Sequence, residues 1–354
     1  MNTKLNIILC LFSCVFPLHS VFPQNDINMG YYGKAYSEMK NMLNGDSPLS
    51  VKRAVFLAEN AYLDGKLDYD KDFCEPLRKG ADYLRRMIAV NHWETYKTAK
   101  QIALCNFFFT PCSGNGQNPF QYDYSNDFSE EDYSKQLVSI TIKTHKGQCR
   151  SLPWTYKLYA EELGADVYLA RVPRHTFIMY KDEDDLFPED WVNVETTAQQ
   201  YQPTWVIKEH FAITDSAIEA GTYITPLTDL QTVACQLADL AFSYFCKYNR
   251  YDDFTLKCVD ESLKFYPKNP NALLIKIKSL EALLRNHLMF NGYLRDYYTD
   301  MVDAQYIRCV KDLQSTHWTQ ETEELHRKWS LTKEEADSIR RNQIYINKEK
   351  RYEH

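Results

Sequence analysis

A cysteine, a histidine and a glutamate occur in that order within residues 147–197, at Cys149, His175 and Glu195. A thiol becomes a strong nucleophile when a nearby imidazole takes its proton, and a carboxylate on the other ring nitrogen orients that imidazole. The three residue types predict attack by Cys149 on an amide carbonyl, with His175 as the base and Glu195 as the orienting acid. Water or an amine would then release the acyl group from the thiol.

A helix is predicted over residues 150–163, directly after Cys149. Gly164 stands at its natural end. A helix start lowers the pKa of a thiol, and its first N–H groups can bind an oxyanion. The adjacent Arg150 adds positive charge. Apolar residues recur along one face of this helix at helical spacing: Leu152, Tyr156, Tyr159 and Leu163.

Three strands are predicted after this helix, over residues 167–172, 175–180 and 191–195. If the last two form a hairpin, one simple register sets Tyr180 opposite Asp190 and His175 opposite Glu195. Directly opposed residues have Cβ atoms about 5 Å apart, which suits a carboxylate that orients an imidazole. Other registers remain open.

The segments around these residues resemble the transglutaminase-like superfamily, which has a papain-like fold and a Cys-His-Asp triad. The resemblance covers residues 136–226 and rests on three motifs: Gly147-Gln148-Cys149, Arg174-His175-Thr176-Phe177 and Trp191-Val192-Asn193-Val194-Glu195-Thr196-Thr197. It implies that Cys149 is the nucleophile, His175 the base and Glu195 the acid. Helices before these motifs and a repeat-like C-terminus further resemble a bacterial subfamily.

Other residues have supporting roles on this interpretation. Glu195 stands where the family usually has Asp, and Asn193, one pleat away on the same strand face, is an alternative orienting residue. Trp191 and Thr197 match the frame around the acid. Gln148 is a candidate for the oxyanion hole. Outside the motifs, His145 is a rival base.

The leading functional hypothesis is a secreted cysteine enzyme that acts on a peptide or protein amide bond, by hydrolysis or acyl transfer, through an acyl-enzyme. The alternative is a catalytically inactive module that binds a protein partner through its C-terminal helices. A third hypothesis, a calcium-dependent transglutaminase, rests on the acidic loop over residues 181–189. That loop is also interpretable as a solvated hairpin tip, since its spacing matches no calcium loop.

Composition excludes several classes of function. The net charge is −7 and no run of Lys and Arg marks a nucleic-acid groove. No Cys-x-x-Cys pair or His-Glu-x-x-His motif predicts a metal site, and no cofactor is expected. Most of the cysteines are interpreted as buried apolar residues, although Cys105 and Cys112 flank a short turn and could form a disulfide.

The first 24 residues are predicted to be a secretory signal peptide. Lys4 gives a positive start and residues 5–16 are largely apolar, too short for a membrane span. Cleavage after Leu18-His19-Ser20 is one alternative. The sequence Leu11-Phe12-Ser13-Cys14 resembles a lipobox, which would leave a lipid anchor on Cys14. Either alternative predicts a secreted, periplasmic or cell-surface protein.

The expected fold class is α+β, with a cysteine-bearing helix packed on a small antiparallel sheet. The motif spanning residues 266–272, Tyr-Pro-Lys-Asn-Pro-Asn-Ala between two predicted helices, is typical of a tetratricopeptide repeat. The predicted regions are a signal peptide over 1–24, N-terminal helices over 25–106, the transglutaminase-like core and its preceding loop over 107–225, tetratricopeptide-like helices over 226–327, and a charged helix or tail over 328–354.

Overall fold

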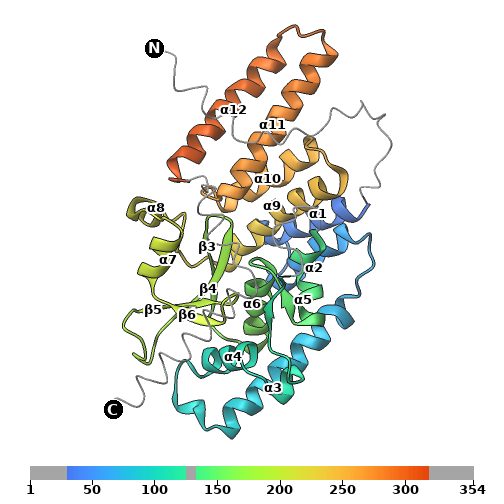
Figure 1. Ribbon diagram of the computed structural model, residues 1–354. Helices are drawn as coiled ribbons and strands as arrows, with labels where there is room; N and C mark the ends of the chain where they lie inside the picture. Colours follow the sequence, from blue (N-terminus) through green and yellow to red (C-terminus); the bar gives the residue numbers. More distant parts are fainter. Residues whose placement is uncertain (1–29, 125–132, 319–354) are drawn as a thin grey trace. The chain divides into compact units, whose positions relative to one another are not determined.

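The computed structural model describes residues 30–124 and 133–318, and it has the mixed helical and sheet architecture that the sequence predicts (Figure 1). The predicted signal peptide and the predicted C-terminal tail lie outside the described residues. No helix in the described ranges combines the length and the apolar character that crossing a membrane requires.

Four helices precede the core, in the region where the sequence predicts N-terminal helices. Ser50 caps the second of them, because its hydroxyl accepts a hydrogen bond from the N–H of Arg53. A π-helical turn, Tyr69–Cys74, leads into the third. The four helices are α1 (Gly30–Asn44), α2 (Val51–Tyr62), α3 (Glu75–Val90) and α4 (Ala99–Phe109).

The helix α5 (Val138–Thr144) precedes the cysteine-bearing segment. The loop before it is described up to residue 124. Its short strand β1 (Gln121–Tyr122) pairs in parallel with β2 (Lys146–Gly147), the strand that leads to Cys149. The described part of the loop therefore lies beside the start of the cysteine-bearing segment.

The helix after Cys149 is α6 (Ser151–Leu163), and it begins one residue later than predicted. Gly164 ends it with φ +72, the left-handed conformation that glycine adopts without strain. Nearly all of its residues are buried, because it packs against α3, α4 and α5 and against the sheet. Burial on all sides fixes the position of its N-terminus, where Cys149 lies.

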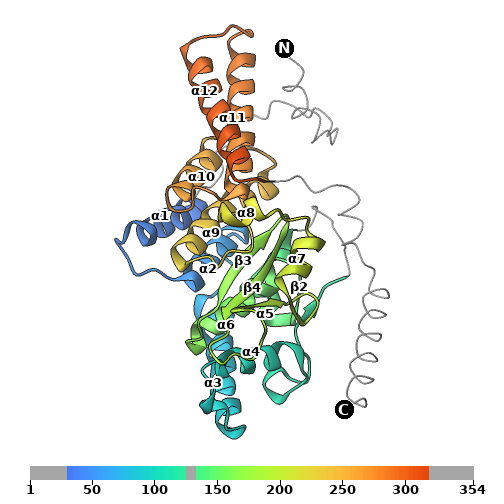
Figure 2. The same cartoon turned by 90° about the vertical axis from the view of Figure 1, so that its left-hand side faces the viewer.

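The sheet is antiparallel in the order β3-β4-β5-β6. Apolar side chains of one face, including Phe177 and Met179, pack with Ile207 and Phe211, while α6 contacts β3 and β4. Figure 2 shows α7 and α8 alongside the strands. The elements are β3 (Tyr168–Val172), β4 (His175–Lys181), β5 (Trp191–Glu195), β6 (Gln200–Gln202), α7 (Thr204–His210) and α8 (Asp215–Glu219).

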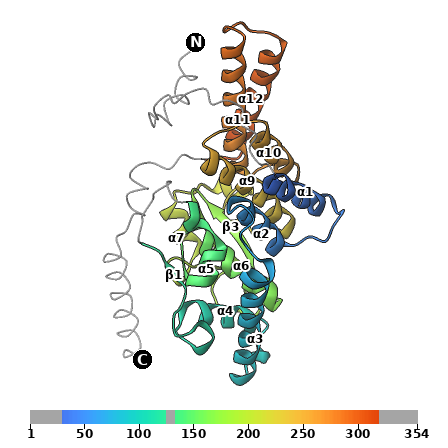
Figure 3. The same ribbon diagram turned by 90° about the vertical axis from the view of Figure 1, so that its right-hand side faces the viewer.

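Four longer helices follow, at the positions predicted from the apolar periodicity and the 266–272 motif. Side chains at their starts accept hydrogen bonds from first-turn N–H groups, for example Thr228 from Gln231 and Asp252 from Phe254. Consecutive helices pack against each other, and α9 also contacts α2 (Figure 3). They are α9 (Asp229–Tyr248), α10 (Asp253–Phe265), α11 (Pro270–Phe290) and α12 (Tyr297–Ser315).

Candidate active site

Cys149 lies in the turn between β2 and α6, two residues before the helix begins. It is partly exposed and is a free thiol. Its Sγ lies 3.6 Å from the carbonyl oxygen of Arg174, and its side chain also hydrogen-bonds to His175. The thiol is therefore at a helix start and in contact with the predicted base.

His175 is the first residue of β4, directly after a two-residue turn formed by Pro173 and Arg174. Arg174 has φ +55, an uncommon conformation for a residue with a side chain, and its carbonyl faces the Cys149 thiol. The Nε2 atom of His175 lies 2.6 Å from Oε2 of Glu195. Because Nε2 is engaged there, Nδ1 is the ring nitrogen available to Cys149.

The predicted strand register is wrong by two residues. Tyr180 pairs with Val192 rather than Asp190, and Ile178 pairs with Val194. When this register is extended to the start of β4, His175 lies diagonally across from Glu195 instead of directly opposite. A two-residue slip keeps every side chain on the same face of the sheet, so the predicted contact forms despite the error.

Glu195 is buried and each of its oxygens is occupied. Oε1 accepts hydrogen bonds from the N–H of Thr197 at 2.9 Å and from its hydroxyl at 2.6 Å, while Oε2 contacts His175. Burial raises the pKa of Glu195, but the charge of His175 and these hydrogen bonds lower it by more, so the pKa lies below its ordinary range. Thr197 fixes the carboxylate that contacts the imidazole.

The pKa of His175 is raised in the same contact. Burial lowers this pKa, but the negative charge of Glu195 and the hydrogen bonds with Cys149 and Glu195 outweigh burial and raise it from 6.5 to about 10. At neutral pH the imidazole therefore carries a proton. The side chains of His175 and Glu195 are only 12% and 8% exposed, which limits screening of this ion pair by water.

Arg150 does not serve the thiol as the sequence suggested. Its guanidinium forms an ion pair with Asp239 of α9 at 2.8 Å and donates to the carbonyl of Gln136 at 2.7 Å. Gln148, the oxyanion-hole candidate, is buried, and its side-chain oxygen accepts a hydrogen bond from the amide of Gln136. Both residues fix the segment around Cys149 through contacts behind the site.

The remaining candidates lie outside the triad. Asn193 donates from Nδ2 to the carbonyl of Gln202 and to Oγ1 of Thr204, both at 3.1 Å, so it contacts α7. Trp191 is at the opposite end of β5 from Glu195 and packs edge-to-face on Tyr168.

The rival base His145 is engaged elsewhere. Its Nδ1 lies 2.6 Å from the carbonyl oxygen of Asn118, and its ring stacks on Phe120. The structure thus brings Cys149, His175 and Glu195 together and leaves His145 outside them.

The acidic loop is exposed at Glu183 and Asp185, as expected for a solvated tip, but its other carboxylates accept hydrogen bonds from neighbouring elements. Asp184 accepts hydrogen bonds from the N–H groups of Lys97 and Thr98 at the start of α4. Asp182 is buried, and Glu189 accepts the N–H of Thr204 at the start of α7. Within residues 30–124 and 133–318, no group of three or more His, Cys, Asp or Glu side chains is arranged to bind a metal ion.

The cysteines of the described ranges are all free thiols, so the predicted Cys105–Cys112 disulfide is not present. Cys105 is buried and its Sγ lies 3.3 Å from the hydroxyl of Tyr156. Burial raises the pKa of Cys105 to about 11. This thiol is therefore a packing residue, in contrast to the partly exposed Cys149.

The described part of the long loop contacts the segment before Cys149 and the segment after Glu195. The N–H of Asp123 donates to the carbonyl of Gly147 at 2.8 Å, next to the cysteine-bearing turn. On the other side, the amide of Gln199 donates to the carbonyl of Phe120, just after the Glu195–Thr197 contact.

Phe211 is a site residue that the sequence did not indicate. Its ring stacks on the imidazole of His175, with centroids 5.2 Å apart and an angle of 26° between the planes. Arg174, with its carbonyl at the thiol, was also missed as a contributor. Phe211 lies outside the motifs and Arg174 has no assigned role within its motif, because each residue acts through a tertiary contact.

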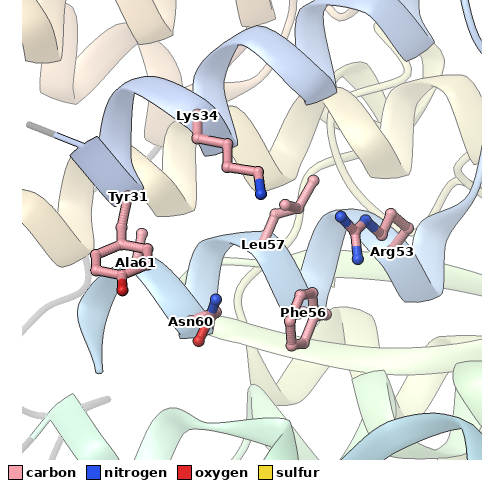
Figure 4. Close-up of a pocket in the computed structure, with 7 residues that line it drawn as sticks. All are labelled: Tyr31, Lys34, Arg53, Phe56, Leu57, Asn60 and Ala61. Carbon is pink, nitrogen blue, oxygen red and sulfur yellow. The ribbon is translucent and has the colours of Figure 1, made fainter. Parts of the chain in front are cut away.

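Two pockets lie away from the triad. One of about 190 Å³ lies between α1 and α2 and is lined by Tyr31 and Lys34 of α1 and by Arg53, Phe56, Leu57, Asn60 and Ala61 of α2 (Figure 4). A second of about 360 Å³ is lined by residues of several helices and by His145. Neither pocket is lined by Cys149, His175 or Glu195, so the chemistry of the triad does not extend into them.

No protein-family model, no curated protein and no solved structure matches this chain. The functional argument therefore depends on the geometry of the site itself.

Proposed function

We propose that the protein is a cysteine-dependent enzyme of transglutaminase-like type that acts on an amide bond of a peptide or protein. The observation that carries this proposal is the His175–Glu195 ion pair at 2.6 Å, with the same imidazole hydrogen-bonded to a thiol at a helix start. Desolvated charge of this kind is concentrated at catalytic sites. A papain-like core and a secreted location belong to the same proposal.

In this mechanism Cys149 attacks as a thiolate, with the imidazolium of His175 beside it. The thiolate attacks the amide carbonyl, and the N–H groups at the start of α6 stabilise the oxyanion. The imidazolium then donates its proton to the departing amine, which leaves an acyl group on the sulfur. Water or an amine transfers its proton to His175 and releases the acyl group.

The test is the pH dependence of Cys149 alkylation by iodoacetamide. We expect Cys149 to react at pH 5 at a rate far above that of an ordinary thiol, whose pKa is about 8.5. The variant Cys149→Ser serves as the control that identifies the labelled site, and Cys112, also partly exposed, is the internal comparison. Equal reactivity of Cys149 and Cys112 at pH 5 would remove the basis of the proposal.

A non-catalytic binding module is the second candidate, and one observation favours it. Large apolar side chains are exposed around the turn between α11 and α12, with Phe290 at 89% and Tyr297 at 79%. Contiguous exposed apolar surface is typical of protein interaction sites. In that case alkylation of Cys149 would be slow, and Cys149→Ala would leave the function of the protein unchanged while Phe290→Ser would impair it.

A further inference from the structure

The helix α7 is attached to the sheet at its first residue by two side chains that the catalytic mechanism does not use. The N–H of Thr204 donates to the carboxylate of Glu189 at 3.1 Å, and its hydroxyl also contacts that carboxylate. The same hydroxyl accepts a hydrogen bond from Nδ2 of Asn193 at 3.1 Å. The start of α7 is thus fixed to β5 and to the loop before it.

The other end of α7 reaches the candidate site. Phe211 follows the helix directly and is only 6% exposed, packed against Phe177 and Met179 of β4. Its ring lies nearly parallel to the imidazole of His175, with centroids 5.2 Å apart. The fixed start of the helix therefore determines where this aromatic ring lies.

We propose that Phe211 is a positioning residue for His175, and that Asn193 and Glu189 act on the imidazole indirectly by fixing α7. The inference rests on the proposed function of Cys149 and His175. A cation within about 6 Å of an aromatic centroid is attracted to the ring face. The phenyl ring stabilises the imidazolium and restricts rotation of its plane, so that Nε2 stays at Glu195 and the other nitrogen stays at the thiol.

Titratable groups from several elements lie beside these two rings. Glu195 on β5 and Cys149 before α6 contact the imidazole, and Arg174 precedes it in the chain. On the far side, the ring of His210 packs edge-on against Phe211, with centroids 4.9 Å apart. A pH profile of the thiol therefore has to be compared between variants that leave all of these groups unchanged.

The test measures iodoacetamide alkylation of Cys149 from pH 4 to pH 9 in the full chain, with thermal unfolding in parallel. Phe211→Leu keeps an apolar cover but removes the aromatic face. It should slow alkylation at pH 5 by a factor of about 3 to 10 and shift the acid limb of the profile to higher pH. Phe211→Tyr should restore the wild-type profile. Thr204→Val, which removes the hydroxyl contacts with Glu189 and Asn193 and keeps the backbone N–H contact with Glu189, should shift the limb in the same direction by less.

The outcomes separate the two proposals. If wild-type Cys149 reacts at pH 5 no faster than an ordinary thiol, the proposed function fails. If wild-type Cys149 is fast and Phe211→Leu has the same profile, the inference about Phe211 is wrong and the proposed function stands. A lower unfolding temperature with an unshifted acid limb would assign Phe211 to packing alone. Should Phe211→Leu not fold, the profile of Thr204→Val decides.

Discussion

Glutamate rather than aspartate at position 195 follows from the strand register. The observed pairing of Ile178 with Val194 places His175 diagonally across from Glu195. Diagonal neighbours have Cβ atoms about 7–8 Å apart, compared with about 5 Å for directly opposed residues. The additional methylene of glutamate spans this difference, and Thr197 fixes the other carboxylate oxygen.

Shortening this side chain should therefore break the contact. In Glu195→Asp the charge is retained but the oxygens no longer reach Nε2 of His175. We expect alkylation of Cys149 at pH 5 to fall by up to about 100-fold, since a misplacement of about 1 Å can have an effect of that size. A Glu195→Asp variant that reacts like the wild type would contradict the diagonal geometry.

The same ion pair predicts how stability depends on pH. The pKa of His175 is raised from 6.5 to about 10 in the folded protein, so the folded state holds a proton that the unfolded state releases. The contribution of this group to the free energy of unfolding is complete below pH 6.5 and is lost as pH rises towards 10. Urea unfolding at pH 6 and pH 9 should show this loss.

Glu195→Gln provides the matched control for that experiment. Glutamine keeps the length of the side chain but removes the charge that raises the pKa of His175. The decrease in stability between pH 6 and pH 9 should be smaller in this variant than in the wild type. An equal decrease in both would show that groups other than this pair are responsible.

At the scale of elements, the acidic loop between β4 and β5 positions helices. Its carboxylates accept N–H groups at the starts of α4 and α7, where the helix dipole favours negative charge. The hydrogen bonds from Thr98 and Lys97 lower the pKa of Asp184 despite partial desolvation. The loop thus connects the N-terminal helices to the sheet that carries His175 and Glu195.

Removing one of these caps should destabilise the protein without affecting the thiol. Asp184→Ala leaves the N–H groups of Lys97 and Thr98, directly before α4, without their carboxylate, so the unfolding temperature should fall by a few degrees. Glu183→Ala, at an exposed neighbouring position, is the control and should change little. Alkylation of Cys149 should be the same in both variants, and a slower rate in Asp184→Ala would connect this loop to the site.

The helices and strands could be predicted because their signals are local. Contacts between distant segments could not be predicted, because nothing in either segment indicates them. The spacing of Leu152 and Tyr156 and the left-handed Gly164 indicated α6 to within one residue, because helix periodicity and termination are local. The role of Asp184 depends on Thr98, 86 residues away, and nothing in the acidic loop indicates it. The strand register was also undetermined, since a slip of two residues preserves the alternation of side chains.

At the scale of the whole described chain, a buried set of charges connects the N-terminal helices, the cysteine-bearing segment and the C-terminal helices. Glu59 of α2 accepts the N–H of Ser139 at the start of α5 at 2.9 Å, and the charge of nearby Arg150 partly offsets the burial that raises its pKa. Arg150 in turn pairs with Asp239 of α9. The cysteine-bearing segment thus contacts helices from both other regions.

Removal of Asp239 should therefore have a large effect. The side chains of Arg150 and Asp239 are 16% and 14% exposed, so Asp239→Ala leaves a buried guanidinium without its partner. Loss of one partner of a buried pair costs about 3 kcal/mol or more, whereas an exposed pair contributes less than about 1 kcal/mol. Urea unfolding of Asp239→Ala should show the larger loss of stability. Asp215→Ala, which removes the exposed partner of Lys208, should show the smaller loss.

Because Arg150 adjoins Cys149, Asp239→Ala should also slow alkylation at pH 5, and Asp215→Ala should not. Similar losses for the two variants would show that the C-terminal helices do not stabilise the cysteine-bearing segment through this pair.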